Sequence, residues 1–311
     1  MPRWPHRVLI ALVVLLVILG ALYYWFIFDG RPSGTVPGFT IDMAKVRTLA
    51  AEQPGERATE VRVETIATMD FPATAVVAGE GWGGFPMGVF SYQLVFPHQT
   101  IVLDTALDEA DGAGMGAKFD QAAYGDMDRA MANAAQIVIT HEHPDHIGGI
   151  LKYPNGSAIV KKLSLSVEQV ASAGKFAGFS ALPPVLAEAS PIAYDDYFAV
   201  APGVVLIKSA GHSPGSQMVF VQRADGKEYL FTGDIGWSMR NIDEVRGRPR
   251  LVSQFMLSNE DRDAVFGELQ ALHDLKAKEP NLVIVPGHDL GVVNELVAAG
   301  TLVAGFADQA P

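Results

Sequence analysis

Four metal-ligand side chains fall within six positions of this 311-residue chain, in the run His141-Glu-His143-Pro-Asp145-His146. The run follows an apolar stretch, residues 137–140, that is typical of a buried strand. Residues two apart on an extended segment project to the same side, so His141 and His143 can converge on one ion while Asp145 and His146 face a second. Imidazole and carboxylate ligands together favour zinc, with iron or manganese as alternatives. We therefore predict a metal site directly after this strand.

Three more residues of ligand type each follow an apolar run and stand beside glycine. They are His212 in Ala-Gly-His-Ser-Pro-Gly, Asp234 in Phe-Thr-Gly-Asp and His288 in Pro-Gly-His-Asp. Loops that turn sharply at glycine after a strand can each present one side chain to a shared cleft. The chain has no cysteine, which excludes thiolate ligands. The sequence therefore predicts a site built from histidine and carboxylate alone.

The order and spacing of these motifs resemble the metallo-β-lactamase superfamily, and the resemblance covers essentially everything after residue 38. It implies an α/β (α+β) fold, an αββα sandwich, that holds two zinc ions. The resemblance assigns the ligands of the first ion as His141, His143 and His212, those of the second as Asp145, His146 and His288, and Asp234 as the bridge between them. It also implies that Asp104, after residues 101–103, supports the ligand histidines from behind.

The resemblance implies a hydrolase in which a hydroxide shared by two metal ions attacks a lactone, ester or thioester. Asp145 and Asp234 are the residues expected to relay a proton to the leaving group. The segment Gly-His-Ser-Pro-Gly-Ser-Gln and the 22-residue step from His212 to Asp234 are similar to N-acyl homoserine lactone lactonases, with hydroxyacylglutathione hydrolases as close relatives. Alternative functions are a zinc phosphodiesterase or nuclease of the same superfamily, and a non-hydrolytic redox or binding protein.

Candidate substrate-contacting residues come from two places in the sequence. The glycine-rich segment 79–84 is followed by Phe-Pro-Met-Gly, which cannot open the helix that a dinucleotide site needs. We expect an early hairpin to lean over the metals, with Trp82, Phe85 and Met87 against an apolar substrate, although a plain turn is an equal alternative. Trp237 stands where the lactonases place a tyrosine, so its ring or indole N–H is expected in the pocket.

An N-terminal apolar segment, residues 8–28, contains no charge over a length that can cross a bilayer. Arg3 and Arg7 precede it and Asp29 follows, which places the N-terminus in the cytoplasm. We predict a membrane anchor at residues 1–29, a linker at 30–38 and a hydrolase domain at 39–311. The protein would then be single-pass in the inner membrane, with its domain on the outer, periplasmic side. The alternative is a signal peptide whose cleavage releases a secreted protein.

The composition restricts the partners of the domain. A formal charge of -12 repels phosphate backbones, so nucleic acid is excluded as a partner. Apolar residues make up 49% of the chain, which indicates a folded protein. The expected partners are a small molecule with a labile acyl bond and, through residues 8–28, the lipid bilayer.

Short apolar runs and turns predict the elements that position these residues. We expect strands at residues 60–67, 74–78, 90–96, 100–104, 137–140, 204–209, 217–222, 228–232 and 282–285. Helices are expected at residues 118–134 and after Ser258, which can cap the helix with Asp261 at its third position. Glu142, between two ligand histidines, is expected to face solvent.

Overall fold

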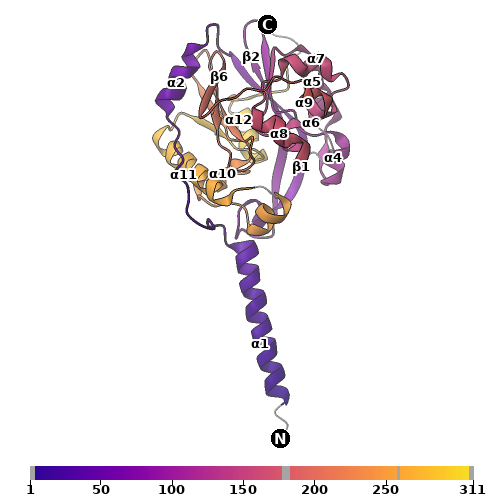
Figure 1. Cartoon of the computed structure of the whole chain (residues 1–311), viewed down its shortest axis with the longest axis vertical. Coiled ribbons are helices and arrows are strands. Elements are labelled where there is room, and N and C mark those ends of the chain that lie inside the picture. The colour runs from indigo at the N-terminus through magenta and orange to yellow at the C-terminus, as the bar shows by residue number, and fades with distance from the viewer. Residues whose placement is uncertain (1–3, 177–182, 258–259, 308–311) are drawn as a thin grey trace.

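Two β-sheets face each other in a computed structural model that describes residues 4–176, 183–257 and 260–307 (Figure 1). The first sheet has the order β11-β1-β2-β3-β5, with β4 paired to β1, and the second has the order β10-β9-β8-β7-β6. The strands of the first sheet are β1 (Glu60–Pro72), β2 (Gly84–Val95), β3 (Thr100–Leu103), β4 (Lys118–Phe119), β5 (Gln136–Val138) and β11 (Val303–Ala304). Those of the second are β6 (Tyr197–Ala201), β7 (Val204–Lys208), β8 (Gln217–Gln222), β9 (Glu228–Phe231) and β10 (Val283–Val285).

Helices cover the outer faces of both sheets. Those of the domain are α2 (Met43–Glu52), α3 (Ala73–Val76), α4 (Glu109–Gly114), α5 (Gln121–Asn133), α6 (Pro144–Lys152), α7 (Gly156–Ile159), α8 (Val167–Phe176), α9 (Pro184–Ala187), α10 (Met239–Asp243), α11 (Arg262–Lys278) and α12 (Leu290–Ala298). Shorter turns are η2 (Val160–Lys162), η3 (Gly233–Ile235) and η4 (Val252–Met256). Helices α2 and α11 lie on one side of the sandwich, and α5 and α6 lie on the other (Figure 1).

Three apolar clusters account for this layering. The cluster between the sheets takes Leu94 from β2 and Leu206 from β7. A second cluster packs Met127 of α5 against the first sheet, and a third packs Leu269 of α11 against the second. Burial of these side chains is the main stabilising term of such a sandwich. The predicted mixed α/β fold is therefore confirmed.

The residues that follow four of the strands lie at one edge of the sandwich. Strands β3 and β5 are parallel neighbours in the first sheet, and β9 and β10 are parallel neighbours in the second. Parallel neighbours end at the same side of a sheet, where ligand-binding residues commonly gather. Asp104 follows β3, His141 lies shortly after β5, Asp234 lies after β9 and His288 follows β10.

Helix α6 packs unusually close to the chain that follows β3. A Cβ on Gly149 would lie 2.5 Å from the Thr105 carbonyl oxygen, and a Cβ on Gly148 would lie 2.6 Å from the Ala106 carbonyl oxygen. Pro144 occupies the first turn, where its missing N–H has no partner to lose. The first turn of α6, which carries Asp145 and His146, is therefore held at a fixed distance from Asp104.

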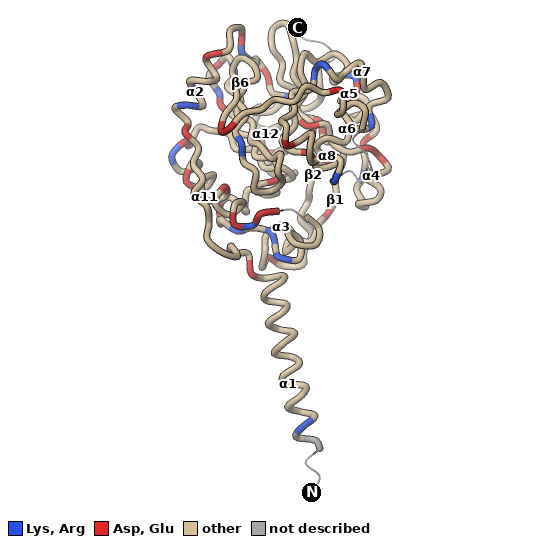
Figure 2. Tube along the Cα trace, viewed as in Figure 1, with Lys and Arg blue, Asp and Glu red and all other residues tan. Residues whose placement is uncertain are grey.

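The N-terminal helix projects from one end of the domain. It consists of α1 (Trp4–Tyr23) and the π-helical turn η1 (Tyr24–Phe28); α1 extends away from the domain, and η1 lies against it (Figure 1). Residues His6–Phe28 are long and apolar enough to cross a membrane, and they are not buried in the domain. A signal sequence has the same features. Charged residues are sparse along α1 and resume where it joins the domain (Figure 2).

Residues 29–38 lie along the domain surface. The buried carboxylate of Asp29 pairs with the buried Arg250 guanidinium at 3.2 Å. Arg262 donates to the carbonyl oxygens of Asp29 and Arg31, at 3.5 and 3.1 Å. The Arg250 guanidinium also donates to Ser33 Oγ at 2.8 Å. The segment predicted as a linker therefore packs onto the domain through specific polar contacts.

Two local predictions are wrong. Residues 74–78 form the short helix α3 and the residues after it rather than a strand, because Ala73 and Thr74 donate to the carbonyls of Gly83 and Gly81 across the β1–β2 connection. Helix α11 begins at Arg262 and is capped by Asp261, which accepts from the N–H groups of Asp263 and Ala264. Ser258, predicted as the cap, lies outside the described residues.

The close approach of α6 gives a testable prediction. Gly149→Ala should destabilise the domain by roughly 1–3 kcal/mol, because the added methyl must push against backbone. Gly174→Ala, in helix α8 with open space at its Cβ, is the matched control and should be neutral or slightly stabilising. Thermal melts of the full chain in detergent measure both. Equal melting temperatures for the two variants would contradict the tight packing of α6.

Candidate metal centre

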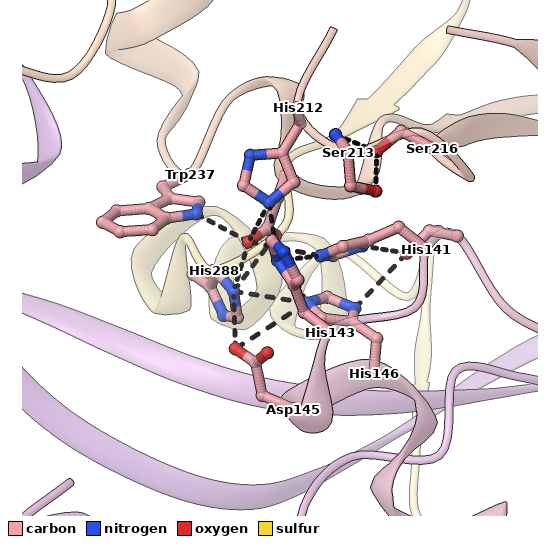
Figure 3. A network of polar contacts seen from close by, with 12 residues as sticks. His141, His143, Asp145, His146, His212, Ser213, Ser216, Trp237 and His288 are labelled. Carbon is pink, nitrogen blue, oxygen red and sulfur yellow. Dashed lines mark hydrogen bonds and ion pairs between the residues drawn. The ribbon is translucent and has the colours of Figure 1, made fainter. Parts of the chain in front are cut away.

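The seven predicted ligand residues meet at the edge described above (Figure 3). Their ligand atoms form two groups in which all atoms lie within 4.8 Å of one another. The first group is His141, His143, His212 and Asp234, and the second is Asp145, His146, Asp234 and His288. Asp234 belongs to both groups, and every member except the half-buried Asp145 is buried. The structure thus brings together all seven residues, in the grouping that the sequence resemblance implied.

Asp234 divides its two oxygens between the groups. Oδ2 lies 3.7 Å from His141 Nε2 and 3.5 Å from His212 Nε2. Oδ1 lies 3.3 Å from His146 Nε2 and 3.1 Å from His288 Nε2. Burial opposes ionisation of Asp234, yet the adjacent histidines hold its pKa well below the usual value. The carboxylate is therefore placed to bridge two cations.

The atoms of this cluster fit divalent metal ions. Asp234 Oδ1 is buried and makes no hydrogen bond, although a buried carboxylate oxygen normally has a partner. His143 Nδ1 lies 3.1 Å from His141 Nε2 and 2.9 Å from His212 Nε2. Burial lowers the pKa of both His141 and His143 and so favours the neutral imidazole that binds metal. In neutral imidazoles, the lone pairs of these ring nitrogens would repel one another at such distances. A metal cation bound between them would accept those lone pairs.

Three of these histidines contact a hydrogen-bond acceptor through Nδ1, the ring nitrogen that faces away from the centre of the cluster. His146 Nδ1 lies 3.0 Å from Asp104 Oδ2, His212 Nδ1 lies 3.1 Å from Glu260 Oε2, and His288 Nδ1 donates to the Gly88 carbonyl at 2.8 Å. Such acceptors fix the tautomer and leave Nε2 facing the centre. Asp104 adopts a positive φ of 59° and also accepts from the Thr140 N–H at 2.6 Å. It lies where the sequence placed it, behind the ligands.

Glu260 and Arg248 are the site residues that sequence reasoning missed. Both are buried, and Arg248 donates to Glu260 through Nε at 3.0 Å and through a second, shorter contact. Although burial opposes it, the Arg248 charge and the hydrogen bond from His212 lower the pKa of Glu260 to about 2. The only sequence signal was the arginine-rich run at residues 246–250 in an acidic chain. Nothing local linked that run to His212.

Glu142 corrects a further prediction, because its side chain is buried rather than solvated. It accepts from Ser213 Oγ at 2.9 Å and from the Gly215 N–H at 3.1 Å. Burial raises the pKa of Glu142 to about 7. These bonds tie the His141 loop to the His212 loop, so Glu142 is part of the scaffold of the site.

Trp237 lies against both the cluster and a cavity. Its indole Nε1 donates to Asp234 Oδ2 at 2.7 Å (Figure 3). The Arg248 guanidinium lies 4.7 Å from the centre of its ring. The ring is buried and meets Phe71 edge to face. Trp237 therefore orients the shared carboxylate as well as lining the cavity beside it.

A cavity of about 240 Å³ opens beside the cluster. Most of its lining is apolar: Met69, Phe71, Met87, Leu107, Met115, Pro144, Trp237, Met256 and Leu257. His143, Asp145, Asp234 and His288 complete it, together with Asp111. Of the residues predicted to contact substrate, Met87 and Trp237 line this cavity. Phe85 packs against a neighbouring apolar cluster, and Trp82 is exposed and reaches the N-terminal helix.

The buried Glu268, next to the His212 loop, predicts how the stability of the domain depends on pH. Glu268 in α11 accepts from the Gly211 N–H at 3.0 Å, and burial raises its pKa to about 8. The folded state therefore keeps this proton to higher pH than the unfolded state, and the stability due to it is lost as pH rises from about 5 to 8. Glu268→Gln should flatten this loss, whereas the exposed Glu52→Gln should not. Thermal melts across this pH range would contradict the assignment if all three proteins lost stability in parallel.

Comparisons with known proteins agree with this geometry. The family model described as the metallo-beta-lactamase superfamily matches residues 86–288, well over half of the chain. An N-acyl homoserine lactonase from Bacillus thuringiensis subsp. kurstaki is 25% identical over 154 residues, which are 50% of this chain and 55% of that protein. The chain thus matches only about half the length of that curated relative.

Solved structures show the same fold. An N-acyl homoserine lactone hydrolase with the product N-hexanoyl-L-homoserine at its catalytic metal centre is 19% identical, with a TM-score of 0.61 over 77% of this chain and 96% of that one. A Bacillus thuringiensis lactonase mutant with N-decanoyl-L-homoserine at its active site is 19% identical, with a TM-score of 0.60 over 77% and 96%. At this identity the likeness concerns the fold alone. On the match of the family model, the chain belongs to the metallo-β-lactamase superfamily.

Proposed function

We propose that this protein is a dinuclear metal-dependent hydrolase that cleaves a lactone, ester or thioester with an apolar acyl part. The observation that carries the proposal is the pair of four-residue ligand groups that share Asp234 at the wall of an apolar cavity. Two divalent ions, which we propose to be zinc, would supply an activated water and polarise the carbonyl oxygen.

The residues of the chain would orient this chemistry. Asp234 accepts a hydrogen bond from the Trp237 indole and would provide one carboxylate oxygen to each ligand group. Asp145 is the half-buried carboxylate of the cluster and lines the cavity, with Oδ2 3.4 Å from His288 Nε2. In lactone hydrolysis the oxygen of water bonds to the carbonyl carbon, the ring C–O bond breaks and one proton reaches the departing alkoxide. We propose that Asp145 carries that proton, and its position beside both the cluster and the cavity supports this role.

The cavity wall supports an acyl substrate over a phosphodiester. Its apolar lining matches a hydrocarbon chain, and none of the described residues that line it is Lys or Arg. The curated relative named above is a lactonase, and of the two solved structures one holds an N-acyl homoserine at its catalytic metal centre and the other at its active site. A polyanionic substrate would also meet the acidic charge of this chain.

We also propose that α1 and η1 form a retained membrane anchor. Support comes from contacts that cleavage of a signal peptide would remove: Trp82 Nε1 donates to Tyr23 Oη at 3.2 Å, and the rings of Phe26 and Phe255 lie 6.2 Å apart. Arg7 before the span then favours a cytoplasmic N-terminus and a domain on the periplasmic side.

The test of the proposed reaction uses the full chain, purified in detergent and freed of metal. Acyl lactones, thioesters, phosphodiesters and β-lactams are offered with zinc, manganese or iron. Lactone or thioester cleavage that a chelator abolishes and metal restores would support the proposal. Selective phosphodiester cleavage, or no turnover by protein that binds two ions, would overturn it.

The shared carboxylate can be tested directly. Asp234→Asn should lose metal and activity together, because the amide lacks the negative charge that links the two ligand groups. Activity should fall by at least the roughly hundredfold that removal of a supporting group costs. The exposed Asp225→Asn is the matched control and should retain both. Metal analysis alongside kinetics decides the matter, and two ions bound to an active Asp234→Asn protein would refute the bridging role.

Trp237→Phe separates the orienting role of the indole from its apolar bulk. We expect metal affinity to weaken roughly tenfold, since the N–H bond to Asp234 is lost while the ring wall remains. Activity at saturating metal should be retained. Competition against a chromophoric chelator measures the affinity, with Trp25→Phe as the control. Unchanged affinity would show that the indole only lines the cavity.

A further inference from the structure

Large apolar side chains lie exposed around the junction between the N-terminal helix and the domain. We name this set the apolar collar: Trp25, Phe28, Trp82, Leu251, Phe255 and Met256. Trp82, Phe255 and Met256 are 64%, 70% and 52% exposed. Exposed apolar surface of this extent marks contact with another molecule or with a membrane. The collar combines residues of η1, of the α3–β2 connection and of η4.

The collar reaches alongside the apolar span rather than stopping at its end. Trp82 donates to Tyr23 and Phe255 packs against Phe26, and both partners lie within residues 6–28. Twenty-three residues of helix span about 35 Å, slightly more than the roughly 30 Å hydrocarbon layer. The last turn and the domain residues beside it therefore fall at the interfacial layer, where tryptophan and tyrosine are favoured.

Buried contacts fix the orientation of the domain on this helix. Asp29 pairs with Arg250, whose guanidinium lies 4.0 Å from the centre of the Trp25 ring. The Gly79 N–H donates to the Ile27 carbonyl at 3.3 Å. Because polar contacts on both sides of η1 hold the junction, the same end of the domain must always face the bilayer.

The lining of the metal-centre cavity reaches the collar. Met256 belongs to the collar and also lines the cavity, and Leu257 continues the lining. Phe71, near the end of β1 in the first sheet, also lines the cavity. In Figure 1 the β1 and β2 ends and the short orange helical segment η4 lie at the end of the domain from which α1 emerges. Met256 and Leu257 thus connect the exposed collar to the lining of the metal-centre cavity.

We propose that the apolar collar lies in the interfacial layer of the bilayer and that the substrate, with a long acyl chain dissolved in the membrane, enters the cavity past Met256. This inference rests on the proposed hydrolase function and on α1 as a retained span. Each added methylene of an acyl chain favours the membrane over water, so long-chain substrates concentrate at this surface. The collar would deliver them without passage through water.

The first test locates the collar without using activity. Because the chain has no cysteine, Phe255→Cys and Val167→Cys can each carry a single nitroxide label in the full chain reconstituted into phosphatidylcholine vesicles. Val167, on α8 and exposed, is the matched control. The label at 255 should be relaxed by lipid-soluble oxygen and shielded from a water-soluble nickel chelate, and the label at 167 should behave oppositely. Equal exposure to the chelate at both positions would overturn the proposal.

The second test measures delivery. In the same vesicles, the double variant Leu251→Ser, Phe255→Ser should cleave a short-chain, water-soluble acyl lactone at the wild-type rate. It should cleave a long-chain lactone held in the bilayer roughly tenfold more slowly, because the weakened collar no longer seats the cavity in the interface. Val167→Ser should match wild type on both substrates. Equal rates on the long-chain substrate, or equal losses on both, would overturn delivery from the membrane.

The two tests separate the possible failures. If the wild-type protein with bound metal cleaves neither lactone, the proposed reaction and the delivery step both fail. The label at 255 still decides the position of the collar in that case.

Discussion

The arrangement of the candidate metal centre depends on one buried carboxylate held between two groups of imidazoles. Burial opposes ionisation of Asp234, yet the adjacent histidines hold its pKa well below the usual value, and its two oxygens face histidines of both ligand groups. The backbone is shaped to allow this: a Cβ on Gly287 would lie 2.4 Å from Asp234 Oδ1, and Gly233 adopts a positive φ of 52°. Burial of such a charge is costly unless cations compensate it, so the surrounding scaffold must be rigid.

That scaffold extends well behind the ligands. The buried Arg248 places its charge beside Glu260 and its flat face against Trp237, so one guanidinium steadies supports of both His212 and Asp234. Glu142 joins the loops that carry His141 and His212. Sites of this kind lose function through small displacements, and the supports therefore matter almost as much as the ligands.

The sequence predicted which seven residues meet in the cluster because they lie in local motifs: four in one run after a strand, and three each beside a glycine after an apolar run. It predicted the mixed α/β fold for the same reason, since the strand patterns are local. It missed Arg248 and Glu260 because their roles arise from contacts across separate loops. The burial of Glu142 was missed because its partners, Ser213 and Gly215, lie about seventy positions later in the chain.

The sealed junction between Asp29 and Arg250 has a consequence for how the protein is made. The two residues are 221 positions apart in sequence, and Arg262, which also holds this segment, is made later still. The N-terminal helix leaves the ribosome first, so Asp29 cannot pair with Arg250 until most of the domain has been synthesised. Closure of the junction is thus a late and strongly non-local step, and such contacts form slowly. The helix can therefore be fixed to its domain only after the chain has been synthesised past Arg262.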